Sequence, residues 1–171
     1  MPIDVLPPRI TTRAAPREIL ATDFEPDGEL PIRGGWGYSF EDAVIIDRDD
    51  PAAAKRKPFN GIAVEYEFVW MRICEELIVL PPDGETYSGI ERKLLQQAVV
   101  DHDGRPFDVL LFEVTAVPDS DWAPLATELE GPDGAGSPWF DAEAHRRKRE
   151  SKTVRFEAEY FFDITSFYGS S

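Results

Sequence analysis

The sequence predicts an α+β protein with a mainly antiparallel β-sheet and two or three helices packed on or beside it. Two stretches, 62–70 and 154–164, alternate apolar with polar residues at every second position. Alternation of this kind in β-branched and aromatic residues is typical of half-buried strands. A third stretch, 107–117, is apolar on both faces through Leu110 and Leu111, so we expect it to lie centrally in the sheet.

The first of these stretches admits two interpretations when it is extended to 61–80. Its alternation is lost in the second half, so the strand interpretation needs a bulge or a break there. A helix is the alternative, because Arg72 and Glu76 are four residues apart and would share a face. Val69 and Val79 would then lie on that polar face, so we predict a strand.

Residues 89–100 are predicted to form a helix. Ser88 and Glu91 fit a capping box, in which the first residue caps the helix and the carboxylate three residues later reaches back. The alternative is a β-hairpin that turns at Asp103-Gly104, because the end of the segment has the composition of a strand.

The 171 residues are expected to form a single domain, in which an extended, proline-rich arm (1–30) lies on an α+β body (31–171). Pro16 suits the first position of a helix, and Asp121 suits an N-cap. Ser137 followed by Pro138 makes a similar start signal. The remaining predicted elements are a helical turn at 16–21, a buried strand at 43–47, a short helix at 121–129 and a helix at about 138–150.

Composition limits the classes of function. The net charge of −15 argues against non-specific binding to nucleic acid or to anionic membranes, which depends on Lys and Arg. Cys74 is the only cysteine, so neither an intramolecular disulfide nor a cysteine-based zinc site can form within one chain. The N-terminal residues lack the features of a signal peptide, and no apolar run is long enough to cross a bilayer. We expect a soluble, cytoplasmic protein without a cofactor.

One stretch has the pattern of an enzyme site. Ile45-Ile46-Asp47-Arg48-Asp49 resembles the strand and DxD opening of haloacid-dehalogenase-type phosphatases. The resemblance implies a divalent metal held by Asp47 and Asp49, or a nucleophilic aspartate. Pro51 departs from that motif, and the alternating strands and helices of the family are not predicted downstream. We therefore favour a strand end followed by a solvated acidic turn.

Two further segments have a structural and a binding interpretation. Glycines at 34, 35 and 37 surround Trp36 and Tyr38, a pattern that permits a bend packed over the sheet or an aromatic binding loop. Residues 145–152 carry five basic side chains and one acidic side chain. That cluster can complement the C-terminal end of a helix dipole, or it can bind an acidic partner.

We predict a non-enzymatic acidic binding protein, of the inhibitor, immunity or accessory-subunit type, with a basic protein partner. If the ribbons at 62–70 and 154–164 are neighbours, four glutamates share one side of the sheet. The alternatives are a metal-dependent hydrolase centred on Asp47 and Asp49, or a structural subunit of an assembly. The predicted partner-binding residues are Glu65, Glu67, Glu157, Glu159, Trp36 and Tyr38.

Overall fold

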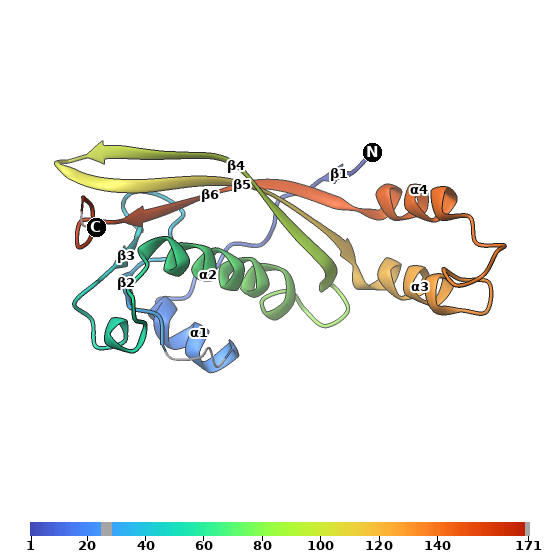
Figure 1. Cartoon of the computed structure of the whole chain (residues 1–171), viewed down its shortest axis with the longest axis horizontal. Coiled ribbons are helices and arrows are strands. Elements are labelled where there is room, and N and C mark those ends of the chain that lie inside the picture. The colour runs from blue at the N-terminus through green and yellow to red at the C-terminus, as the bar shows by residue number, and fades with distance from the viewer. Residues whose placement is uncertain (25–28, 170–171) are drawn as a thin grey trace.

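A computed structural model describes residues 1–24 and 29–169, and in that part of the chain it confirms the predicted α+β fold (Figure 1). The six-stranded sheet has the order β2-β3-β6-β5-β4, and β1 also pairs with β6. Its long pairs, β4 with β5 and β5 with β6, are antiparallel, whereas β1 and β3 run parallel to β6. The strands are β1 (Ile3–Asp4), β2 (Ile32–Gly34), β3 (Val44–Ile46), β4 (Tyr87–His102), β5 (Arg105–Pro118) and β6 (Val154–Asp163). The α-helices are α1 (Pro16–Phe24), α2 (Gly61–Cys74), α3 (Asp119–Glu130) and α4 (Ala142–Lys152).

The predicted strand at 61–80 is wrong, because this segment forms α2 and then a wider π-helical turn, Glu75–Val79. The side chain of Asn60 caps α2 by accepting a hydrogen bond from the N–H of Ala63. The strand interpretation assumed that the polar stripe of such a helix would face water. Instead, the three charged residues of that stripe are buried, so the stripe faces the protein interior as the apolar positions beside it do. The side chains concerned, each 1% exposed, are Glu65, Arg72 and Glu76.

The predicted helix at 89–100 is also wrong, and the alternative hairpin is correct. β4 pairs with β5 along nearly its whole length and turns at Asp103-Gly104, both of which have positive φ. This is the backbone that a two-residue hairpin loop of type I′ requires. Ser88 does not cap a helix; its hydroxyl donates to Asp119. The extensive pairing with β5 overrides the local helix signal.

The two faces of the long strands have different surroundings. Even-numbered side chains of β5 and β6 face α2, where Phe112 packs edge-on against Tyr66 and Phe162 against Phe68. Odd-numbered side chains of these two strands point to the opposite side of the sheet. In Figure 1, α1 and α2 lie together on the other side. We call the side of β4, β5 and β6 that is opposite α2 the open face. In the described residues it is covered at one end by Phe40 and approached at the other by α4.

The predicted strands at 43–47, 107–117 and 154–164 correspond to β3, β5 and β6. The turn at Pro16 extends to helix α1, so the arm at 1–30 is only partly extended, and its residues 25–28 lie outside the described part of the chain. The two later helices start at other residues than predicted: α3 follows Pro118, and α4 is capped by Asp141. These two helices project together beyond one end of the sheet (Figure 1).

Candidate functional site

One edge of β6 has a gap between its two short parallel partners. β1 pairs with Val154 and Arg155, and β3 pairs with Phe162 and Asp163. The guanidinium of Arg72 reaches this gap from α2 and donates to the carbonyl oxygen of Glu159, at 3.1 Å. No described strand pairs with Glu159 on this side, so the guanidinium supplies the hydrogen bond that a neighbouring strand would otherwise donate. Arg72 therefore completes the sheet edge with a side chain.

Arg72 is held by aromatic rings and by a carboxylate. Its guanidinium lies 4.1 Å from the ring centre of Tyr38 and 3.8 Å from that of Tyr160, within the range of cation–π contacts. It also donates to the carbonyl of Trp36, at 3.1 Å, and lies 3.6 Å from a carboxylate oxygen of Glu76. The hydroxyl of Tyr38 donates to that same oxygen at 2.6 Å. This buried cluster attaches the glycine-rich loop to α2 and β6.

Burial sets the protonation behaviour of this cluster. It raises the pKa of Glu76, an effect that the positive charge of Arg72 and the hydrogen bond from Tyr38 oppose. Burial also raises the pKa of both tyrosine hydroxyls, Tyr38 and Tyr160, far above neutral pH. At neutral pH the tyrosines are thus hydrogen-bond donors, not bases.

A cavity of about 440 Å³ adjoins the cluster and brings three predicted site residues together. Glu157 and Glu159 are exposed on β6, and Tyr38 is half-buried below them. Trp36 is only 5% exposed and takes part through its backbone. The cavity is lined by Leu6, Pro7, Arg9, Tyr38, Arg72, Glu76, Glu157, Ala158 and Glu159.

The other two predicted site residues, Glu65 and Glu67, lie on α2 and do not line this cavity. Glu65 is buried beside Asp108 of β5. Burial, with a further contribution from the Asp108 carboxyl group, raises the pKa of Glu65 to about 9. Glu67 forms an ion pair with Arg56 at 2.9 Å. The prediction that all four glutamates line one side of the sheet is therefore wrong.

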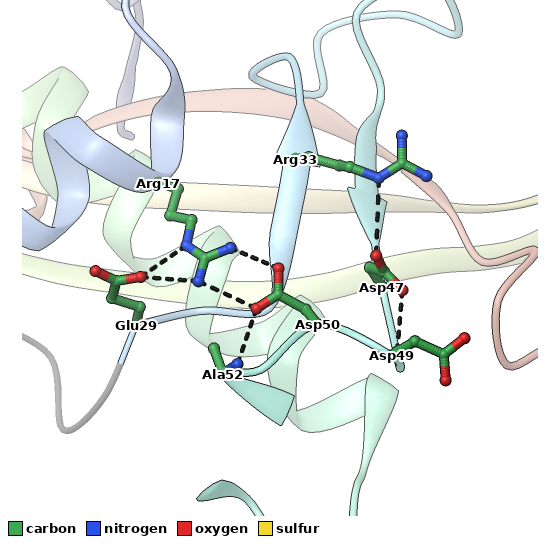
Figure 2. Close-up of polar contacts among 7 residues, drawn as sticks. All are labelled: Arg17, Glu29, Arg33, Asp47, Asp49, Asp50 and Ala52. Carbon is green, nitrogen blue, oxygen red and sulfur yellow. Dashed lines mark hydrogen bonds and ion pairs between the residues drawn. The ribbon is translucent and has the colours of Figure 1, made fainter. Parts of the chain in front are cut away.

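Figure 2 shows the acidic turn that follows β3. One oxygen of Asp47 accepts from the backbone N–H of Asp49 at 2.9 Å, and the Asp49 carboxylate points away from Asp47. Arg33 lies 3.9 Å from Asp47. Both oxygens of Asp50 accept from Arg17, whose hydrogen bond holds the pKa of Asp50 below its usual range. Within residues 1–24 and 29–169, no three His, Cys, Asp or Glu side chains are placed to hold a metal ion.

The open face contains an acidic residue, Glu113, that the sequence analysis did not assign to the site. Glu113 of β5 lies opposite Glu157 of β6 on one side and Lys93 of β4 on the other. Beside these charges is a shallow groove of about 300 Å³. It is lined by Phe40, Gln96, Ala98, Val100, Val109, Leu111, Glu159 and Phe161. Glu113 lies within the segment 107–117, and the expectation that this segment is apolar on both faces hid its charge.

The basic cluster on α4 is largely paired within the chain. Lys148 donates to Glu128 of α3 at 3.0 Å, and Lys152 lies 3.8 Å from Asp121. Arg149 lies 3.7 Å from Glu91 of β4. These contacts favour the structural interpretation of the cluster, in which its charge holds α4 against α3 and the sheet.

No family model matches the sequence, and comparisons with curated proteins and with solved structures give no match. Among the described residues, no helix combines the length and the apolar character that crossing a bilayer requires. The surface chemistry of the molecule is therefore the basis for assigning a function.

Proposed function

We propose that this is a non-enzymatic binding protein whose open face receives a basic protein partner. The observation that carries the proposal is the combination on that face of an apolar groove with the acidic side chains of Glu113, Glu157 and Glu159. Interfaces commonly place an apolar centre beside a charged rim, and complementary charge selects the partner.

A basic side chain from a partner protein would stabilise the acidic side chains on the open face. Glu113 and Glu157 are direct cross-strand neighbours, and like charges opposite each other destabilise a sheet. Lys93 lies next to Glu113 on the β4 side. The charge of Arg155, which is paired with Asp4, acts on both glutamates from β6. A lysine or arginine from a partner, placed above Glu113 and Glu157, would relieve this repulsion, and an apolar side chain next to it would enter the groove.

Other features agree with a binding role. Cys74 is 6% exposed, and burial raises the pKa of its thiol to about 11, so little thiolate exists at neutral pH. The ring of His102 stacks on Phe40, with ring centres 4.1 Å apart. The net charge of −15 would increase the rate of encounter with a basic protein.

The test is capture of partners from extracts of the native host by three immobilised forms of the protein. The first is wild type, and the second carries Glu113→Gln, Glu157→Gln and Glu159→Gln. The third is a control with the same loss of charge at exposed sites elsewhere, namely Glu18→Gln, Glu41→Gln and Glu85→Gln.

We expect a basic protein that binds wild type and the control but is lost from the open-face variant, measured by quantitative mass spectrometry. Circular dichroism checks that all three forms are folded. Equal capture by the two glutamine variants, or capture only of acidic proteins, would contradict the proposal.

A further inference from the structure

The outer edge of β4 is a long strand edge that no other described strand pairs with. β4 is the terminal strand of the sheet, and its 16 residues make it the longest. α2 covers β5 and β6 but leaves both faces of β4 exposed over 91–97. Leu94 is 36% exposed and Val99 is 53% exposed. An unpaired edge of this kind presents backbone N–H and C=O groups ready to bind another strand.

The middle of this edge lacks the charges and prolines by which proteins usually prevent pairing. Such edges commonly carry charges or proline, yet Leu94–Val100 contains seven consecutive residues without a charge, proline or glycine. In the whole chain 30% of residues are charged, so an uncharged run on an exposed strand is unusual for this protein. Within this uncharged run β4 has a bulge at Leu95, which has no partner of its own on β5, and a second irregularity lies outside the run, between Ser88 and Glu91.

We propose that β4 pairs antiparallel with β4 of a second copy of this chain, about a two-fold axis at Gln97. Directly paired side chains must lie on the same face of the joined sheet. With the bulged Leu95 left unpaired, as it is against β5, this axis pairs Leu94 with Val99 of the second copy on the α2 side. The same register pairs Gln96 with Ala98 on the open face.

The charges at the ends of the uncharged run identify a second copy as the occupant. In the same register Arg92 meets Asp101 of the second copy, and this opposite-charge pair occurs twice because of the two-fold symmetry. Glu91 likewise meets His102 of the second copy. Parallel pairing in register would bring like charges together, at a cost in stability. Two copies of β4 thus match each other in three ways. Paired side chains lie on the same face, apolar residues meet apolar residues, and opposite charges meet.

The test measures the dimer dissociation constant of the full chain by sedimentation, up to about 100 µM, where a dimer of micromolar affinity is almost fully formed. Arg92→Glu and Asp101→Arg should each weaken the dimer about tenfold or more, since each places like charges at both symmetric pairs. Mixing the two variants should restore affinity. In the mixed dimer the two introduced side chains meet each other at one pair, and the native Arg92 meets the native Asp101 at the other. Thermal melts report whether each variant is folded.

A cysteine scan tests the register independently. Gln97→Cys places two thiols across the axis, where facing Cα atoms are about 4.5–5.5 Å apart, within the range of a disulfide. Lys93→Cys is the control, since its two copies would be about 20 Å apart. Oxidation should join the first variant and not the second. A monomeric wild type, a mixture that fails to recover affinity, or equal crosslinking of both cysteine variants would each overturn the proposal.

Discussion

At the scale of single residues, the molecule places charges where a helix would be expected to bury apolar groups. Glu65 on α2 has its carboxyl group beside that of Asp108, and neither residue is more than 4% exposed. Gln97 donates to the Asp108 carboxylate at 2.8 Å. This arrangement favours a protonated Glu65 in the folded protein.

Glu65 should make stability depend on pH in a particular direction. Its pKa is about 9 in the folded protein and near the ordinary 4.5 when unfolded. Between these values the folded state holds a proton that the unfolded state has released, so stability is full below pH 4.5 and falls as pH rises toward 9. We expect a loss on the order of 2–3 kcal/mol between about pH 5 and pH 7 from this group.

Glu65→Gln removes the proton from this equilibrium while keeping the shape of the side chain. Chemical denaturation at about pH 5, 7 and 8.5 should show that the free energy of unfolding of the variant increases relative to that of wild type as pH rises. Glu67→Gln is the matched control and should follow wild type, because Glu67 lies on the same helix but is ion-paired at the surface. Parallel curves for wild type and Glu65→Gln would show that Glu65 is ionised in the folded state.

At the scale of elements, hydrophobic periodicity predicted β5 and β6 because each strand lies beside neighbours that bury one face fully. It failed for 61–80, where the buried Glu65 and Arg72 of α2 and Glu76 of the π-helical turn removed the amphipathic contrast that distinguishes a helix. For β4, an edge strand exposed on both faces, no apolar alternation was required, and the capping pattern at Ser88 decided the prediction wrongly.

Residues of the candidate site could be predicted only where the strand or loop that holds them was itself predicted correctly. Glu157, Glu159 and Tyr38 were identified and do come together, because β6 was predicted correctly and the glycine-rich loop bonds to it. Glu113 was missed since it lies within the strand expected to be apolar on both faces. The neighbour of a charge across a sheet depends on register, and a single sequence does not specify register between distant strands.

Core packing of β6 gives a stability prediction at this scale. Phe156 faces α2 and is 5% exposed, whereas its neighbour Glu157 is exposed on the open face. Phe156→Ala should cost about 3–5 kcal/mol through lost burial and the cavity left behind. Glu157→Gln, its control, should change stability by about 0.5 kcal/mol or less. Similar urea midpoints for the two variants would contradict the assigned faces of β6.

At the scale of the whole molecule, acidic charge is the main unfavourable electrostatic term. A chain with a net charge of −15 repels itself when compact, and salt screens that repulsion. We expect the melting temperature to rise between low salt and about 0.5 M NaCl, where the screening length is only a few ångströms.

The control variant with Glu18→Gln, Glu41→Gln and Glu85→Gln carries three fewer negative charges. It should melt at a higher temperature than wild type in low salt and gain less from added salt. A melting temperature that falls with salt would mean that ion pairs such as Lys148–Glu128 outweigh the repulsion.

The place of β6 in the sheet has a consequence for synthesis. Its partners are Ile3 and Asp4, Val44 and Ile45, and most of β5. Among the described strands, β1, β2 and β3 are thus connected to β4 and β5 only by pairing through β6. On the ribosome, the strands β1 and β3 therefore remain unpaired with β6 until residues 154–163 have been synthesised. Contacts between residues so distant along the chain make folding slow, and the waiting segments expose unpaired edges meanwhile. Synthesis of β6 thus ends the period in which the edges of these earlier strands are exposed to aggregation.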